Sequence, residues 1–203
     1  MPLDAIHHAF FARQCQEGMA LCGESDLLEL TPVDPLPAPQ RYIVTLRCTG
    51  LCRTDSGAIV ETNLSHVGLH FPDQYLRSVD RPIAIWLGPP SIWAPNILAP
   101  SRDRGAPLAP SWICMGHINP GTTLTAVLHQ LFEIVTYQRF STHDALNRDA
   151  AAWARQNLDR FPVDRRPLKR RRLRLTFGKE TTGLRGPSAS PIGGATGDGT
   201  RTT

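Results

Sequence analysis

The feature that most constrains this chain is a change of hydrophobic period along its length. Between residues 41 and 87 apolar and polar residues alternate in short runs, of which Arg41–Cys48 (RYIVTLRC) is the clearest, and a period of two predicts strands. From Thr123 to Tyr137 the apolar residues recur at helical spacing, which predicts an amphipathic helix. Strands followed by helices in separate runs favour an α+β fold with helices on one face of an antiparallel sheet.

The other elements extend this plan. Asp4–Leu21 has the spacing of a half-buried first helix, and a last helix is expected to begin at Asn147, whose side chain can cap it, and to end before Phe161-Pro162. Thr122 or Thr123 is expected to cap the middle helix. From the short apolar runs we expect a four-stranded antiparallel meander, followed by an irregular segment that contains Cys114. The runs of the meander are Arg41–Cys48, Ala58–Val60, His66–Phe71 and Pro82–Leu87, with a turn at Asp55-Ser56-Gly57. Leu27–Leu30 is expected to be a short strand before them, joined to Arg41–Cys48 by a Pro-rich connection.

The length of 203 residues suits one domain with an extension. We expect residues 1–168 to form the domain and residues 169–203 to be a basic, disordered tail, because the tail has few large apolar side chains. Residues 165–203 carry ten Lys and Arg against two acidic residues, so residues 1–164 carry a net charge of −4 within the total of +4. A basic run such as KRRRLRL can contact phosphates, but no aromatic stacking platform accompanies it, so nucleic-acid binding is not expected.

The sequence also bears on the compartment. It contains no run of about 18 apolar residues, and its N-terminus lacks the pattern of a secretion signal. Its five cysteines form no framework of paired spacings, which is typical of reduced thiols rather than disulfides. We therefore expect a soluble, unexported, cytoplasmic protein that does not engage a membrane.

The polar residues allow two other interpretations, a zinc site and a Cys-His hydrolase. Cys48-x3-Cys52 followed by His66-x3-His70 resembles the spacing of a zinc finger. The alternation in HVGLHF predicts a strand instead, which separates the two histidines by about 13 Å, too far for one zinc ion. We therefore expect no metal and no cofactor.

A Cys-His hydrolase is the second reading, because Cys114 has His117 nearby and His143-Asp144 downstream. The nucleophilic cysteine of such enzymes usually begins a helix, whose dipole lowers the thiol pKa. Cys114 instead precedes Gly116 and lies nine residues before the helix expected at Thr123, which disfavours this reading.

Taken in order, several segments resemble ubiquitin-conjugating (E2) enzymes, in particular the bacterial E2-like proteins of antiphage ubiquitin-like conjugation operons. WAPNI resembles the His-Pro-Asn-Ile loop of that family, with Ala94 in place of the histidine, and ICMG resembles its active-site stretch. The resemblance covers about residues 4–168. The other matching segments are GLHFPDQYLR, NPGTTLTAVLHQLFEIV and THDALNRDAA. The seventeen residues between Asn96 and Cys114 are about ten more than usual in the family, and the surplus lies around Ser101–Pro110.

The resemblance implies a UBC-like fold and a thioester carrier. It places Cys114 at the thioester-forming position, Asn96 where a side-chain amide can stabilise an oxyanion, and Asp144 at the acidic position beside the cysteine. The implied partners are an E1-like activating enzyme, a ubiquitin-like protein and a target protein. The alternative is a non-catalytic module of the same fold that only binds a ubiquitin-like partner. Structural roles also stay open for two of these residues: Asn96 would cap its own loop, and Asp144 would stabilise a turn.

Overall fold

The computed structural model describes residues 2–98, 111–141 and 143–170, without the side chains of residues 2–4. These residues belong to one compact unit. The loop around Ser101–Pro110 and the tail beyond Arg170, expected to be disordered, lie outside the described residues. The elements in order are α1 (Pro2–Gly23), β1 (Leu28–Pro32), β2 (Arg41–Leu46), β3 (Gly50–Arg53), β4 (Ile59–Thr62), β5 (Ser65–His70), β6 (Ala84–Gly88), β7 (Ser111–Trp112), α2 (Leu124–Val135), α3 (Arg148–Gln156) and the short 3-10 helix η1 (Leu158–Arg160).

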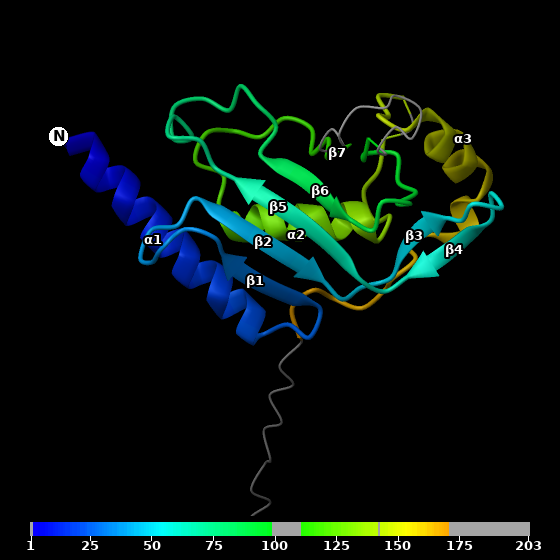
Figure 1. The fold of residues 1–203 in the computed structure, drawn as a ribbon, viewed down its shortest axis with the longest axis horizontal. Helices are drawn as coiled ribbons and strands as arrows, with labels where there is room; N and C mark the ends of the chain where they lie inside the picture. Colours follow the sequence, from blue (N-terminus) through cyan, green and yellow to red (C-terminus); the bar gives the residue numbers. More distant parts are fainter. Residues whose placement is uncertain (1, 99–110, 142, 171–203) are drawn as a thin grey trace, which may run out of the picture. The chain divides into compact units, whose positions relative to one another are not determined.

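The central feature is a five-stranded sheet in the order β1-β2-β5-β6-β7, in which every neighbouring pair is antiparallel. Val44 of β2 pairs with Leu30 of β1 on one side and with Val67 of β5 on the other. Figure 1 shows α2 behind this sheet. An N-terminal helix, an antiparallel sheet and further helices confirm the α+β class.

The alternation of apolar residues decides which face of the sheet is covered. Along β2 the buried side chains are Tyr42, Val44 and Leu46, and they belong to the same hydrophobic cluster as Phe11 of α1 and Leu128 of α2. A strand points successive side chains to opposite faces. The helices therefore cover one face, as the sequence predicts.

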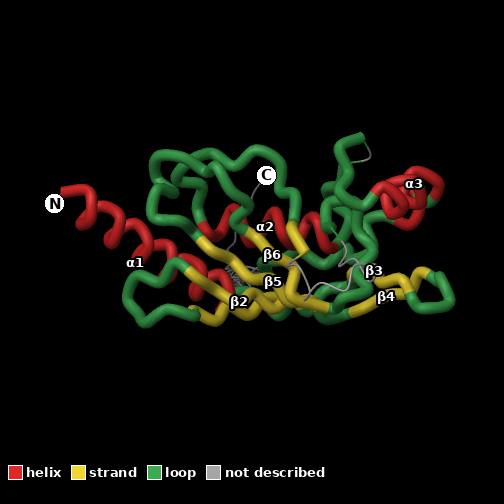
Figure 2. Tube along the Cα trace, turned by 45° about the horizontal axis from the view of Figure 1, so that its top comes forward, coloured by secondary structure: helices red, strands yellow, loops and turns green. Residues whose placement is uncertain are grey.

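The predicted four-stranded meander needs correction. The main sheet has five strands, because it includes β7. The strands β3 and β4, which lie between β2 and β5 in the sequence, form a separate two-stranded sheet. The hairpin has its turn at Asp55-Ser56-Gly57, as expected, with Gly57 at φ 85°, a value that favours glycine. β3 leaves the main sheet because its free edge pairs elsewhere: the N–H of Trp93 donates to the carbonyl of Leu51 at 2.8 Å. Figure 2 shows the hairpin near α3, away from α1.

A close approach sets the position of α1 against α2 and β1. A Cβ at Gly18 would lie 2.8 Å from Leu124 of α2 and equally near Leu30 of β1, so a larger residue would push the elements apart. The buried side chain of Gln14 also accepts a hydrogen bond from the N–H of Leu124 at 2.7 Å. This bond satisfies one of the amides that a helix N-terminus leaves unpaired.

Both later helices begin where the sequence predicts. The side chain of Thr123 accepts from the N–H of Ala126 at the start of α2, and the side chain of Asn147 accepts from the N–H of Ala150 at the start of α3. Helix α2 buries an apolar face against the sheet. Within the described ranges, no helix has the length and apolar character that crossing a membrane requires.

The end of the described chain is held by a buried carboxylate. Asp164 is 4% exposed and accepts from the N–H of Thr49 at 2.9 Å and from the guanidinium of Arg166 at 2.7 Å. Burial alone would raise the pKa of Asp164, but these hydrogen bonds and the adjacent positive charge outweigh it and lower the pKa to about 2. Three residues after Arg166, Lys169 pairs with Glu24, close to the end of α1.

We predict that Asp164→Asn lowers the free energy of unfolding by about 2 kcal/mol at pH 7, because a depressed carboxyl pKa stabilises the folded state above its unfolded-state pKa. The contribution is complete above about pH 4 and fades as the pH falls towards the folded-state pKa. Urea unfolding of both proteins at pH 7 and pH 2.5 measures it. As a control, Asp26→Asn, which removes an exposed pair with Arg170, should change stability by under about 0.5 kcal/mol. A pH-independent difference for Asp164→Asn would contradict this account.

Candidate functional site

Cys114 lies two residues after the end of β7 and is held by hydrogen bonds of its backbone. Its N–H donates to the carbonyl of Asn96 at 2.8 Å, and the side-chain amide of Asn96 donates to the carbonyl of Cys114 at 3.0 Å. The neighbouring residue Ile113 pairs with Ile97 in an isolated bridge. Two hydrogen bonds to one residue fix the backbone of Cys114 while leaving its thiol partly exposed.

The long insertion does not separate Asn96 from Cys114. The N–H of Leu98 donates to the carbonyl of Trp112 at 2.9 Å, so the chain leaves and re-enters the site at neighbouring positions. Ile97 also pairs with Ile113 in an isolated bridge, so the described residues on either side of positions 99–110 lie next to each other. Asn96 and Cys114 therefore meet although seventeen residues separate them in the sequence.

The Trp93–Asn96 loop is braced by hydrogen bonds to its backbone. Ala94 is 1% exposed, and the hydroxyl of Tyr137 donates to the carbonyl of Trp93. The N–H of Asn147, the cap of α3, donates to the carbonyl of Pro95 at 3.0 Å. Contacts from α3 and from the residues after α2 thus hold the backbone that presents Asn96.

The chain turns sharply after the cysteine. Gly116 has φ 73°, a left-handed value that residues with a Cβ rarely adopt. The side-chain amide of Gln130 in α2 donates to the carbonyl of Met115. The cysteine is therefore fixed on both sides, by Asn96 before the turn and by α2 after it.

Within the described residues, Asp144 is connected to Cys114 only through the hydrogen bonds of Ser141 and Asn96. The side-chain carbonyl of Asn96 accepts from the N–H of Ser141 at 3.2 Å, and the hydroxyl of Ser141 accepts from the N–H of Asp144 at 3.1 Å. Asn96, which is 9% exposed, uses both ends of its amide in these bonds. The structure thus joins Cys114 directly to Asn96 and only indirectly to the exposed Asp144. His143, like Asp144, is exposed in this loop.

A cavity of about 420 Å³ opens beside the thiol. Cys114 lines it together with Asp80 and Arg81 from the loop before β6, with His117 from the turn and with Leu146 from the loop before α3. The cavity supplies a carboxylate, a guanidinium and an imidazole within one concave surface around a nucleophilic atom. Such an arrangement can seat an extended acyl group and orient an attacking amine.

The thiols of the other four cysteines have a raised pKa. Burial raises the pKa of the Cys15, Cys22 and Cys52 thiols, and it raises that of Cys48 to about 12. Since the thiolate is the reactive form of cysteine, these side chains are poor nucleophiles near neutral pH.

The two histidines of the rejected zinc reading lie on a strand. Both His66 and His70 belong to β5, and the ring of His66 is 3.2 Å from the hydroxyl of Thr45. In the part of the chain that the structure describes, no group of three or more His, Cys, Asp and Glu side chains is placed to hold a metal ion.

Sequence reasoning missed two residues that share the cavity with Cys114. Asp80 and Arg81 lie more than thirty positions before the cysteine and belong to no recognisable motif. They reach it because Ile85 of β6 pairs with Trp112 of β7, which brings the start of β6 alongside the residues after β7. This contact follows from the order of the strands in the sheet, which no local pattern of the sequence indicates.

The chain matches no protein-family model, and no curated protein matches its sequence.

We predict that Cys114 is the first thiol to react with a limiting amount of iodoacetamide at pH 7.5, because it is exposed to a cavity while burial suppresses the other four. Peptide mapping after partial alkylation measures the order. Cys114→Ala should remove the fast phase, whereas Cys22→Ala, the matched change at another partly exposed cysteine, should retain it. Earlier labelling of Cys22 than of Cys114 would refute the prediction.

Proposed function

We propose that the chain is an E2-like conjugating enzyme that accepts a ubiquitin-like protein from an E1-like enzyme as a thioester on Cys114. It then transfers the acyl group to an amine of a target protein. The observation that carries the proposal is the joint placement of Cys114 at a cavity and of Asn96 against its backbone. The resemblance to the bacterial proteins assigns the reaction to antiphage defence in the cytoplasm.

Loading needs an accessible thiolate more than a strong base. The sulfur of Cys114 attacks the acyl carbon of the E1 thioester, the new carbon–sulfur bond forms, and the E1 thiolate leaves. One thioester replaces another, so the reaction is close to balance and the small thiolate fraction of a free cysteine near neutral pH suffices. A cysteine outside a helix N-terminus fits this demand.

Transfer needs more assistance, because an amine attack creates an oxyanion on the acyl carbon. Donors aimed at such an oxyanion commonly contribute on the order of 100- to 1,000-fold in rate. The amide of Asn96 donates one N–H to the carbonyl of Cys114, and its second N–H is the candidate donor. Fixing the cysteine backbone is its second contribution.

A lysine amine must also lose a proton to attack, since its pKa of about 10.4 keeps it protonated at neutral pH. Asp144 is the proposed group that orients the amine and takes the proton, with His117 at the cavity or His143 beside Asp144 as the substitute. Asp144 is exposed and tethered to Asn96 through Ser141, so it can approach an incoming lysine from the solvent side.

The alternative is a non-catalytic module that binds a ubiquitin-like partner and leaves Cys114 unused. A partly exposed cysteine that opens on a cavity favours the enzyme, because a binding module has no need of an accessible thiol there. The distinction is experimental: only the enzyme forms a covalent adduct.

We predict that the full chain, incubated with ATP, its E1-like enzyme and its ubiquitin-like partner, forms a thiol-sensitive adduct seen on non-reducing gels. Cys114→Ala should abolish the adduct, and Cys114→Ser should give a thiol-resistant ester. Cys48→Ala, if folded, should load normally. An adduct on Cys114→Ala, or its loss only in Cys48→Ala, would overturn the assignment.

We predict that Asn96→Ala and Asp144→Ala still load Cys114 but discharge it to free lysine more slowly, by about 10- to 100-fold. Single-turnover discharge after E1 is quenched separates the two steps. Asp80→Asn is the comparison at another carboxylate near the thiol, and a slower discharge there than in Asp144→Ala would reassign the acidic role. Equal loss of loading in both Ala variants would indicate structural roles.

A further inference from the structure

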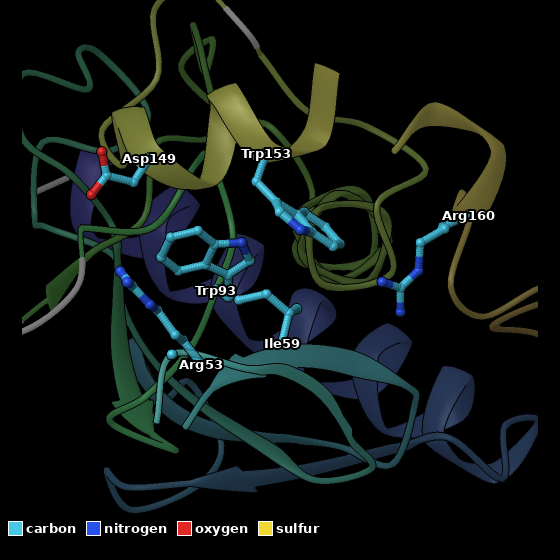
Figure 3. Close-up of a pocket in the computed structure, with 7 residues that line it drawn as sticks. Arg53, Ile59, Trp93, Asp149, Trp153 and Arg160 are labelled. Carbon is cyan, nitrogen blue, oxygen red and sulfur yellow. The ribbon is translucent and has the colours of Figure 1, made fainter. Parts of the chain in front are cut away.

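A second cavity of about 420 Å³ lies between the β3–β4 hairpin and α3. Figure 3 shows Arg53 and Ile59 of the hairpin, Trp93 from the loop before Asn96, Asp149 and Trp153 of α3, and Arg160 of η1 around it. Cys114 does not line this cavity. It forms a separate concave site, which none of the preceding chemistry uses.

Both arginines of the cavity are held against aromatic rings. The guanidinium carbon of Arg53 lies 5.0 Å from the ring centre of Trp93, and that of Arg160 lies 5.2 Å from the ring of Trp153. Cation–π contact of this kind orients a guanidinium while leaving its N–H groups free. Two planar donor groups are thus positioned at the cavity.

Neither arginine has an anionic partner among residues 2–98, 111–141 and 143–170. Several other described arginines do: they pair with carboxylates within 3 Å, as in Arg13–Glu17 and Arg47–Glu29. Asp149 at the rim is likewise outside every ion pair of these ranges. The lining therefore has two positive charges and one negative charge, and hydrogen-bond donors outnumber acceptors.

A buried donor supplies an independent observation. Trp93 is 7% exposed, and its indole N–H has no acceptor in the described structure. The comparable indole of Trp86 donates to the carbonyl of Pro89 at 2.7 Å. In Figure 3 the indole nitrogen of Trp93 lies on the side of the ring towards Trp153. A buried donor without a partner is unfavourable, so an oxygen placed between the two indoles would relieve the deficit.

We propose that this cavity, which we call the Arg53–Arg160 pocket, binds an acidic segment of a partner protein. The carboxylates of aspartate or glutamate pair with the two guanidiniums, which can bind them in a bidentate manner. Apolar parts of the segment pack on the indoles, since tryptophan and arginine are the residues that most often dominate protein interfaces.

The charges favour a peptide over a nucleic acid. A phosphate at every nucleotide would bring one close to Asp149 at the rim, and a carboxylate repels phosphate. A peptide offers backbone N–H groups or a basic side chain to Asp149 instead.

Fluorescence anisotropy with the full chain tests the proposal. The probe is a fluorescein-labelled octapeptide of alternating glutamate and leucine, compared with its lysine–leucine counterpart and with labelled oligo(dT). We expect saturable binding of the glutamate peptide alone. Arg53→Glu combined with Arg160→Glu should weaken it roughly tenfold or more. Arg77→Glu combined with Arg165→Glu makes the same change of net charge outside the pocket and should leave the affinity within about twofold.

Because Arg53 and Arg160 are exposed, the paired variant should fold, and circular dichroism checks this. Should it unfold, each single reversal is measured alone. Unchanged affinity in the folded Arg53→Glu and Arg160→Glu proteins overturns the proposal, as does absence of saturable binding. Binding of oligo(dT) through both arginines would replace it with nucleic-acid recognition. Cys114→Ala should bind the peptide normally, so the result does not depend on the proposed conjugating activity.

Discussion

The candidate site depends on the hydrogen bonds made by the side-chain amide of Asn96. Its N–H group binds the carbonyl of Cys114, and its oxygen binds the N–H of Ser141. These bonds join three segments that are far apart in sequence: the loop after β6, the strand end that bears the thiol and the loop that leads to α3. A buried polar group without a hydrogen-bond partner costs about 1–3 kcal/mol. The hydrogen bonds of both the NH2 group and the oxygen of Asn96 therefore stabilise this arrangement. The place of Asn96 against the backbone of Cys114 is thereby fixed by hydrogen bonding.

The loop that carries Asn96 is held by hydrogen bonds to its backbone. Ala94 offers no polar group, yet the carbonyls on either side of it are both occupied, that of Trp93 by the hydroxyl of Tyr137 and that of Pro95 by the N–H of Asn147. Burial raises the pKa of Tyr137 above its ordinary value, so this hydroxyl remains a donor throughout the physiological range. Asn147 contributes twice, because its side chain also caps α3.

Local patterns predicted most of the elements and little of how they meet. Alternation located β2 and β5, helical spacing located α2, and the caps at Thr123 and Asn147 were recognisable because capping is chemistry between near neighbours. The hairpin was misplaced in the sheet, since its strands have the same local pattern as sheet strands and only the pairing of β3 with the loop at Trp93 removes them. Asp80 escaped notice for the same reason: pairing across strands, rather than proximity in sequence, brings it to Cys114.

The segment Trp93–Asn96 has a different environment at each end. Asn96 faces the cysteine strand, whereas the ring of Trp93 lies under the guanidinium of Arg53 in the Arg53–Arg160 pocket. Only two residues separate them, and Pro95 restricts the conformation of that short connection. A ligand that shifted the indole of Trp93 would therefore strain the backbone that positions Asn96, unless the hydrogen bond from Tyr137 to the Trp93 carbonyl absorbed the movement. The Arg53–Arg160 pocket and the cavity at Cys114 are thus different surfaces. The two sites nevertheless depend on the same short, hydrogen-bonded stretch of chain, Trp93–Asn96.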